Sequence, residues 1–306
     1  MAGIFNKLFS RKPSAVSSGA ETPTVPIMEL PPSAETTEVH GKIHLGLPQL
    51  IIGCAQSVGK QRDHNEDSLL AINSLLSGNG EYIPFGLYMV ADGMGGHKHG
   101  EIASGLAVRT VANQVVNRVF LALLSPEPKG PSDPIQEIFQ ASLQDAHRLV
   151  MKEAPGSGTT LTGVMVFNKQ MTIAHVGDSR MYAITPNGEV SLITRDHSLV
   201  MRMMELGQLS EQDAAIHPQR NVLYRALGQG EIFSPDITTS PLPTSGSLLL
   251  CSDGLWGVVP QSELARIINT NPDPRIAAQL LVDAANAAGG PDNISAILIR
   301  LPDQAF

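Results

Sequence analysis

Short apolar runs and longer segments with a helical period follow one another along this chain. The short runs, several of them bounded by Gly, Asp or Asn, predict strands, because such runs between turn residues are typical of buried strands. In the longer segments Ala and Leu recur every three or four residues, which is the period of an amphipathic helix. The predicted strands span residues 50–54, 86–91, 160–167, 171–176, 248–251 and 294–300, and the predicted helices span 101–124, 134–152, 261–268 and 274–288.

The order of these elements indicates the fold class. Strands come in pairs and helices come as two consecutive segments in each of two places, so strand and helix do not alternate strictly. This order predicts an α+β fold in which helices cover antiparallel sheet. The chain has 306 residues, of which 42% are hydrophobic, so it can bury a substantial core.

The first 46 residues differ from the rest in composition. Residues 14–41 are rich in Pro, Thr, Ser and Glu and predict a linker without a core of its own. Ahead of this linker, residues 1–12 combine apolar positions at helical spacing with a basic end. Two interpretations stay open for them: a docking peptide or weak membrane-surface anchor, and a frayed terminus. We therefore expect a flexible tail over 1–46 and one compact domain over 47–306.

Charge and cysteine content exclude several classes of protein. The net charge of −8 argues against nucleic acid as a partner, since binding to a phosphate backbone rests on clustered Lys and Arg. Cys54 and Cys251 are far apart and have no zinc-site spacing, which favours a reducing cytoplasm. No apolar run reaches the roughly 18 residues that span a bilayer, and no signal peptide is evident. We expect a soluble, cytoplasmic protein.

Acidic turns stand at the ends of several predicted strands. An Asp that follows a strand and precedes Gly can offer a carboxylate and a main-chain carbonyl to a cation. One Asp-Gly turn is common, but five acidic turns in one domain indicate a shared purpose. The turns contain Asp67, Asp92, Asp178, Asp253 and Asp292.

These residues favour the chemistry of hard cations. All of the candidate ligands are oxygens, which suits magnesium or manganese. Two such ions about 4 Å apart can activate a water molecule between them. The guanidinium fork of Arg62 suits a phosphate group. The set therefore points to phosphoester hydrolysis, and no P-loop or kinase motif favours transfer from ATP.

Eight motifs then occur in one order between residues 51 and 301. By these motifs the sequence closely resembles the bacterial branch of the type 2C, metal-dependent serine/threonine protein phosphatases. The motifs are RDHNED, VADGMGGH, GSGTTLTGVMV, AHVGDSRMY, ITRDHSLV, NVLYRALG, LLLCSDGLW and GGPDNISAILI.

The resemblance implies a fold, an activity and partners. The fold is an α-β-β-α four-layer sandwich of two antiparallel sheets flanked by helix pairs, with residues 47–306 as the catalytic domain. The activity is hydrolysis of phosphoserine and phosphothreonine on proteins by a water or hydroxide that bridges two divalent metals. Phosphorylated proteins are then the substrates, a serine/threonine kinase pathway supplies them in signal transduction, and a monomer is expected.

The resemblance also implies a role for each residue of the acidic motifs. The two core ions, manganese or magnesium, would be held by four aspartates and one carbonyl. These ligands are Asp67, Asp92, Asp253, Asp292 and the Gly93 carbonyl.

Further roles lie around this core. Asp178 resembles a residue that helps to bind a third, weaker metal. Arg62 would grip the substrate phosphate, and Glu66 would contact metal-bound water. Residues 198–221 match a flap that influences substrate choice. Two interpretations are open for its apolar side chains, a flexible contact surface and ordinary helix packing, of which packing is favoured; these side chains are Met201, Met203, Met204 and Leu206.

The proton donor is left open by the sequence. Many eukaryotic members have a His directly after the second Asp-Gly, where this chain has Met94. His97 is a candidate general acid. Alternatively, His97 is a loop residue that only forms a hydrogen bond to the turn. Metal-bound water is another possible source of the proton. His64, His99 and His197 are weaker candidates, and none is taken as a ligand.

A second functional class is an alternative to the enzyme. The same fold can serve as a noncatalytic regulatory module, and such a module would be expected to lose metal carboxylates. All of the core Asp positions are present here, which favours the enzyme.

Overall fold

The computed structural model describes residues 49–78, 81–95, 99–125, 130–131, 133–231 and 233–302. These residues belong to one compact unit, Gly46–Phe306. The predicted tail of residues 1–46, with its basic segment 1–12, lies outside the described residues, and so does His97.

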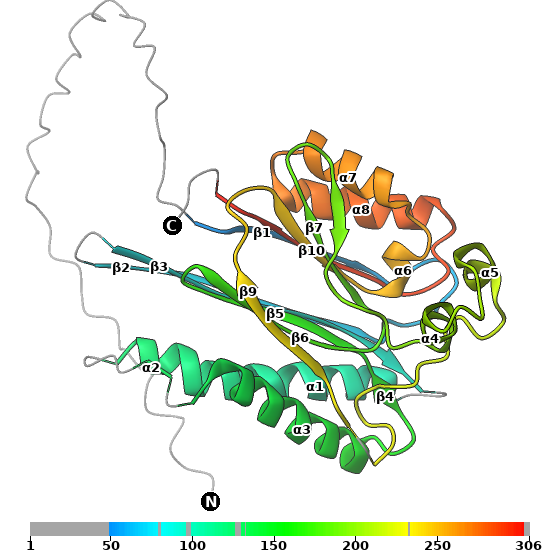
Figure 1. The fold of residues 1–306 in the computed structure, drawn as a ribbon, viewed down its shortest axis with the longest axis horizontal. Helices are drawn as coiled ribbons and strands as arrows, with labels where there is room; N and C mark the ends of the chain where they lie inside the picture. Colours follow the sequence, from blue (N-terminus) through cyan, green and yellow to red (C-terminus); the bar gives the residue numbers. More distant parts are fainter. Residues whose placement is uncertain are drawn as a thin grey trace, which may run out of the picture. The chain divides into compact units, whose positions relative to one another are not determined.

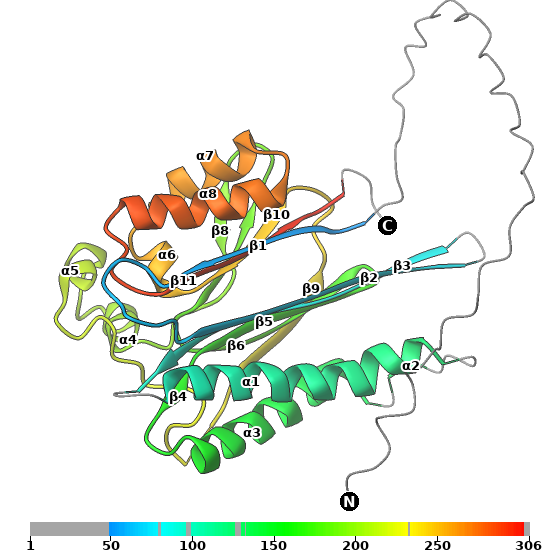
Figure 2. The ribbon, with the colours of Figure 1, turned by 180° about the vertical axis from the view of Figure 1, so that it is seen from behind.

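Two antiparallel sheets form the middle of the unit (Figures 1 and 2). The first has the strand order β1-β11-β10-β7-β8, and the second has the order β2-β3-β5-β6-β9 with β4 paired to β3. The first sheet consists of β1 (Ile51–Ser57), β7 (Arg180–Ile184), β8 (Val190–Leu192), β10 (Ser247–Cys251) and β11 (Ile294–Arg300). The second consists of β2 (Asp67–Gly78), β3 (Glu81–Met94), β4 (Gly158–Thr159), β5 (Leu161–Phe167), β6 (Gln170–Val176) and β9 (Asp236–Pro241).

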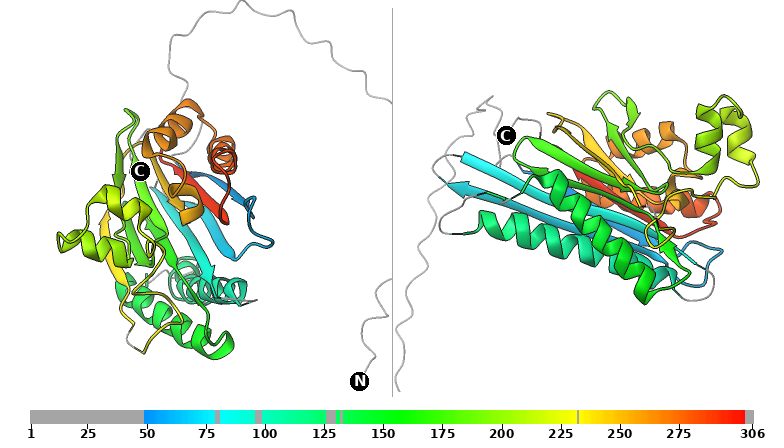
Figure 3. Two further views of the ribbon diagram at one scale, coloured as in Figure 1. Left: turned by 90° about the vertical axis from the view of Figure 1, so that its right-hand side faces the viewer. Right: turned by 60° about the horizontal axis from the view of Figure 1, so that its bottom comes forward.

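Helices cover the outer face of each sheet, as Figures 1 and 3 show. The second sheet is covered by α1 (Gly100–Val115), a π-helical turn (Val116–Phe120), α2 (Leu121–Leu123) and α3 (Ile135–Glu153). The first is covered by α6 (Asp253–Trp256), α7 (Gln261–Thr270) and α8 (Pro274–Ala287). Between β8 and β9 the chain forms α4 (Leu199–Glu205) and α5 (Glu211–Ile216), which lie in the segment matched to the flap. The predicted α-β-β-α architecture is confirmed.

Three apolar layers hold the sandwich together. Strand β3 shows how, because its side chains alternate between the faces of the sheet. Tyr88 and Val90 pack between the two sheets, whereas Leu87, Met89 and Ala91 pack under α1 and α3. Both faces of the strand are therefore buried, which explains why its sequence is a continuous apolar run rather than an alternating one.

The sequence pattern locates the long helices and the buried strands but not every element. The predicted helix 101–124 is α1 with the π-helical turn and α2 behind it. Strands β2, β4, β7, β8 and β9 have no counterpart among the six predicted strand ranges. Strand β9 reads DITTSP and is partly exposed, so it lacks the apolar run that identifies its neighbours.

The first sheet and α8 approach so closely at Gly53 that a side chain there has no room. A Cβ atom on Gly53 would lie 2.0 Å from the Pro274 carbonyl oxygen. We expect Gly53→Ala to lower the free energy of unfolding by about 2 kcal/mol, because α8 must move away from β1. Urea unfolding of the metal-free protein measures this change.

Gly105→Ala on α1 is the matched control. The nearest atom to a Cβ there is the flexible end of Arg109, at 2.9 Å. Alanine forms helix better than glycine, so we expect this variant to gain up to about 1 kcal/mol. If both variants lost stability equally, the close approach at Gly53 would not be the cause.

Candidate metal centre

The register of the β2–β3 hairpin brings two of the predicted ligands together. Asp67 begins β2, and its partner across the strand pair is Asp92 near the end of β3. Directly opposed residues in an antiparallel pair point to the same face of the sheet. The two carboxyl groups are therefore neighbours, and each carboxylate disfavours the charge on the other.

The other sheet supplies two more aspartates at the same end of the sandwich. Asp253 is the first residue of α6, directly after β10, and Asp292 precedes β11. Strands β10 and β11 are paired, with Cys251 opposite Ala296, so the chain ends that carry the two aspartates meet. Asp253 and Asp292 both face Asp92 electrostatically, which places carboxylates from both sheets in one cluster.

Crowding and mutual repulsion make this cluster unfavourable for negative charge. Burial, followed by the charge of neighbouring carboxylates, raises the pKa of Asp67 to about 7. The same causes raise the pKa of Asp253 to about 6 and that of Asp92 well above its ordinary value. A positive charge among these groups would reverse the effect and favour the ionised forms.

Two carboxylate oxygens in the cluster have no hydrogen-bond partner. Oδ2 of Asp67 accepts hydrogen bonds from the hydroxyl groups of Ser252 at 2.8 Å and Ser295 at 2.6 Å. Among the described residues, Oδ1 of Asp67 and Oδ1 of Asp253 are inaccessible to solvent and bond to no protein group. Unpaired buried oxygens are costly, and an oxygen-coordinated divalent cation would satisfy them.

The fifth aspartate lies at the edge of the cluster. Asp178 follows Gly177, which takes a φ of 104° in the turn between β6 and β7. Burial and then the charge of Asp253 raise the pKa of Asp178 well above its ordinary value. Asp178 therefore lies near enough to Asp253 and Asp92 for the charges of these carboxyl groups to act on one another.

Arg62 lies at the rim of the cluster. Its Nη2 atom donates a hydrogen bond to Oδ2 of Asp292 at 2.8 Å, and 48% of the Arg62 side chain is exposed. Exposure leaves much of the guanidinium fork free to meet a phosphate that arrives from solvent.

Gly93 is placed beside Asp92 by very tight packing. A Cβ atom on Gly93 would lie 2.2 Å from the Gly100 carbonyl oxygen at the start of α1. The main-chain N–H of Gly93 donates to the carbonyl of Glu66 at 3.2 Å. Only glycine fits between these groups, and the ligand role of its carbonyl stays a prediction.

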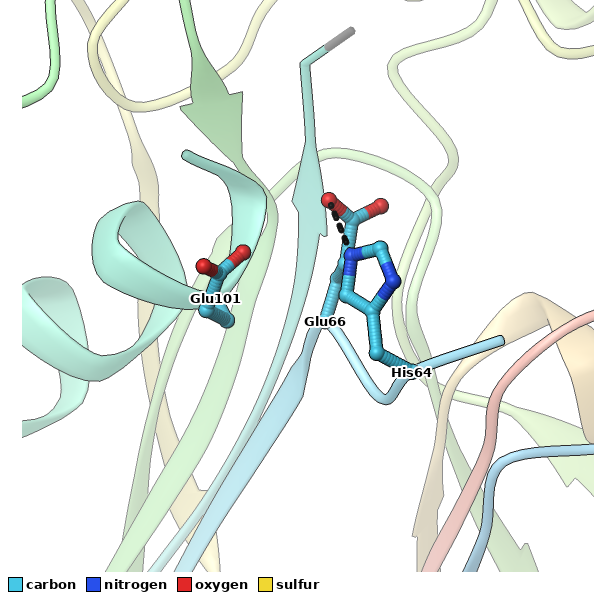
Figure 4. Close-up of side chains that lie close together, drawn as sticks. All are labelled: His64, Glu66 and Glu101. Atoms are coloured by element: carbon cyan, nitrogen blue, oxygen red, sulfur yellow. Dashed lines mark ion pairs between the residues drawn. The ribbon is translucent and has the colours of Figure 1, made fainter. Parts of the chain in front are cut away.

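Glu66 faces a second group of potential ligands, shown in Figure 4. Nε2 of His64 lies 3.5 Å from Oε1 of Glu66. Glu101, near the start of α1, completes a group in which one ligand atom from each residue lies within 4.8 Å of the others. His64 is more than half exposed, and such groups are common without an ion.

The five aspartates are more widely spread than this second group. Within the described part of the chain, no three of them bring ligand oxygens within 4.8 Å of one another, as His64, Glu66 and Glu101 do.

Sequence reasoning missed the residues that hold these ligands in place. The buried side chain of Asn293 accepts from the Glu66 N–H at 2.8 Å and donates to the carbonyls of Val58 and His64. Ser252 and Ser295 fix Asp67, as described above. Ser252 and Asn293 each adjoin an aspartate of an acidic turn, and Ser295 lies near the start of an apolar run, so the sequence held a signal for these three residues. It held none for Glu101.

The described histidines His99 and His197 differ in their contacts. His99 precedes α1 and makes no side-chain cap. His197 is buried, and its ring nitrogens contact the Gly177 N–H and Oδ2 of Asp236. Both ring nitrogens of His197 thus contact protein groups. The predicted role of His97 stays a prediction.

The raised pKa values predict how the metal-free protein responds to pH. In the unfolded chain these carboxyl groups ionise near 3.8, whereas in the folded protein Asp67 and Asp253 hold their protons up to about 7 and 6. The unfolded state therefore releases protons first, and the free energy of unfolding falls as pH rises through this window and levels off above it. Urea unfolding in the presence of a chelator, between pH 5 and 8, measures the decline.

The Asp92→Asn variant distinguishes repulsion among the clustered carboxyl groups from a general sensitivity of the protein's stability to acid or base. Removing one of the facing charges should raise the stability of the metal-free protein at pH 8 and flatten its pH dependence. The same variant should lose most of the rise in melting temperature that manganese gives the parent protein. A variant less stable than the parent at pH 8 would show that repulsion is not the dominant effect.

The fold and this cluster together define a class: a two-sheet α+β sandwich with a carboxylate site for divalent cations at one end of its strands. A comparison with family models matches residues 54–294 to "Protein phosphatase 2C". The chain belongs to the protein phosphatase 2C family, whose members are metal-dependent.

Relatives and solved structures agree with this assignment. The "Serine/threonine phosphatase stp" of Listeria innocua is 36% identical over 248 residues, which cover 79% of this chain and 92% of the relative. A serine/threonine phosphatase of S. agalactiae is 28% identical with a TM-score of 0.68, covering 82% of this chain and 99% of that one. The catalytic domain of the phosphatase PstP, solved "in complex with 2 Manganese ions", is 27% identical with a TM-score of 0.65, covering 84% of this chain and 100% of that one.

These similarities establish the activity. The chain is a protein serine/threonine phosphatase, as the resemblance of its eight motifs implies. Across the described residues, no helix combines the length and the apolar character needed to cross a membrane.

Proposed function

We propose that this phosphatase hydrolyses phosphoserine and phosphothreonine on proteins at the cluster formed by Asp67, Asp92, Asp253 and Asp292. The observation that carries the proposal is the pair of solvent-inaccessible, unpartnered oxygens on Asp67 and Asp253 within a group of repelling carboxylates. Positive charge in this arrangement would stabilise the ionised carboxylates and satisfy the two oxygens. The all-oxygen donor set suits manganese or magnesium, and the two manganese ions of the PstP structure support a pair.

When bound, a pair of divalent ions supplies an activated water and neutralises charge on the phosphoryl oxygens. The protein groups then have separate tasks. The four aspartates hold the pair, with the Gly93 carbonyl as a further ligand. Asp178 helps to hold a third ion at the edge. Arg62, which faces solvent beside Asp292, binds the phosphate and orients its ester bond.

The second half of the reaction requires a proton for the departing serine or threonine oxygen. Met94 ends β3 where many eukaryotic members have a histidine, and a thioether donates no proton. We propose His97 as one source and solvent at the centre as the other. Glu66 does not bind a metal directly but contacts a metal-bound water molecule, because the carboxylate of Glu66 is grouped with His64 and Glu101 and not with the aspartates.

Cellular context completes the proposal. The substrates are phosphorylated proteins that a serine/threonine kinase produces, and the enzyme acts as a monomer in the cytoplasm. Residues 47–306 form the catalytic domain and residues 1–46 a tail whose basic segment, 1–12, docks the enzyme to a protein or a membrane surface.

A substitution in the cluster tests the enzyme directly. With manganese present, the protein should cleave p-nitrophenyl phosphate and a phosphothreonine peptide. Asp253→Asn should reduce kcat at least about a thousandfold, since it removes a ligand and the charge that holds an ion. Rates of phosphate release measure both.

Asp283→Asn provides the matched control, because Asp283 is an exposed residue of α8 whose carboxylate accepts a hydrogen bond from Gln279, outside the cluster. It should keep the parent rate. An Asp253→Asn protein with full activity, or a parent protein with none, would contradict the proposed site.

Removal of residues 1–45 tests the division between tail and domain. The shortened protein should keep the parent kcat and KM on p-nitrophenyl phosphate, because every residue of the cluster lies beyond this point. Steady-state kinetics measure both constants. A loss of more than about tenfold in kcat/KM would show that the tail belongs to the catalytic unit.

A further inference from the structure

The turn that carries Asp178 is held from several sides. His197 donates its main-chain N–H to the Gly177 carbonyl at 2.7 Å. The Ser179 hydroxyl bonds that of Thr160 at 2.6 Å, and the Ser179 carbonyl accepts from Thr162 at 2.7 Å. These contacts fix the residues on either side of Asp178.

One contact reaches Asp178 itself. Nε1 of Trp256 donates a hydrogen bond to the Asp178 carbonyl at 2.9 Å. Trp256 is the last residue of α6, the four-residue helix that begins with Asp253. Residues three apart on a helix lie on the same face. One short helix thus carries a metal-site carboxylate at its start and, at its end, the group that holds Asp178.

The indole is in turn held by Arg180. The guanidinium carbon of Arg180 lies 3.4 Å from the centroid of the Trp256 ring, a cation–π stack. The fork of Arg180 bonds both carboxylate oxygens of Asp196, at 3.0 Å and 2.8 Å. Asp196 is almost fully buried and Arg180 only 17% exposed, so water competes little for this pair.

We propose that Trp256 is a positioning residue, which sets the separation of Asp178 from Asp253 and thereby the affinity of the third, outer ion. Arg180 and Asp196 hold the indole in the orientation that this requires. The proposal rests on the proposed function, in which Asp178 helps to bind that ion. Trp256 itself offers no ligand atom, so its effect on the ion passes through the main chain of Asp178.

The experiment counts manganese ions instead of relying on turnover. Electron paramagnetic resonance of free Mn²⁺ gives the number of sites on the full-length protein and the Kd of each. Asp178→Asn identifies the outer site as the one that this variant removes. Trp256→Phe keeps a ring for Arg180 to stack on but has no N–H. It should weaken the outer site about five- to tenfold, the equivalent of one hydrogen bond, and leave the inner sites within about twofold.

Arg180→Lys tests the support of the indole. Lysine keeps the charge but has neither the fork nor the flat face, so the outer site should weaken here too. Trp256 is the chain's single tryptophan, and its emission should shift in this variant as the ring loses its stack. Arg266→Lys is the control, since Arg266 is exposed on α7 and its guanidinium pairs with Glu263 of the same helix. Arg266→Lys should change neither the manganese affinity of the outer site nor the emission of Trp256.

The outcomes separate this inference from the proposed function. Parent-like affinity at the outer site in both Trp256→Phe and Arg180→Lys would overturn the positioning role while leaving the phosphatase intact. A parent protein that binds only two ions, with Asp178→Asn removing none, would overturn it as well. A parent protein without manganese binding or activity would instead refute the proposed function. Circular dichroism checks folding, and if one variant fails to fold, the other decides.

Discussion

The structure around the aspartate cluster depends on one constraint, which is electrostatic repulsion. The carboxylates face one another with little water between them. Asp67 and Asp92 stand opposite each other in one sheet, and Asp253 and Asp292 approach from the other. Such groups lower the stability of a protein that holds no cation. The surrounding fold must therefore be stable enough to keep them together, and it is stable for reasons that lie elsewhere in the sandwich.

The apolar layer between the sheets supplies much of that stability. Tyr88 and Val90 of one sheet and Leu248 and Leu250 of the other are fully buried there. Each strand that carries an aspartate continues directly into this layer. The apolar part of a strand thus anchors the acidic residue at its end, and packing free energy offsets the electrostatic cost. Ser252, Ser295 and Asn293 then fix the orientation of individual groups by hydrogen bonds.

The sequence predicts the fold class and the acidic residues well, because both leave local signals. Apolar runs mark the buried strands, and an Asp in a short turn beside such a run marks each candidate ligand. The register that sets Asp67 opposite Asp92 has no such signal, since it depends on how the whole β2–β3 hairpin pairs. The same is true of contacts between distant segments, such as Trp256 with Asp178. Strand β9 was missed because half-exposed Thr and Ser residues give no apolar run.

The pairing of β1 with β11 has a consequence for how the unit can be built into other proteins. Ile51 at the start of β1 lies opposite Arg300 at the end of β11. The chain therefore enters and leaves the sandwich at one place, along one pair of strands. A unit of this kind can be inserted into a loop of another protein, or circularly permuted by a short linker, without separating the strands that carry the aspartates. Its modularity comes from this strand pair.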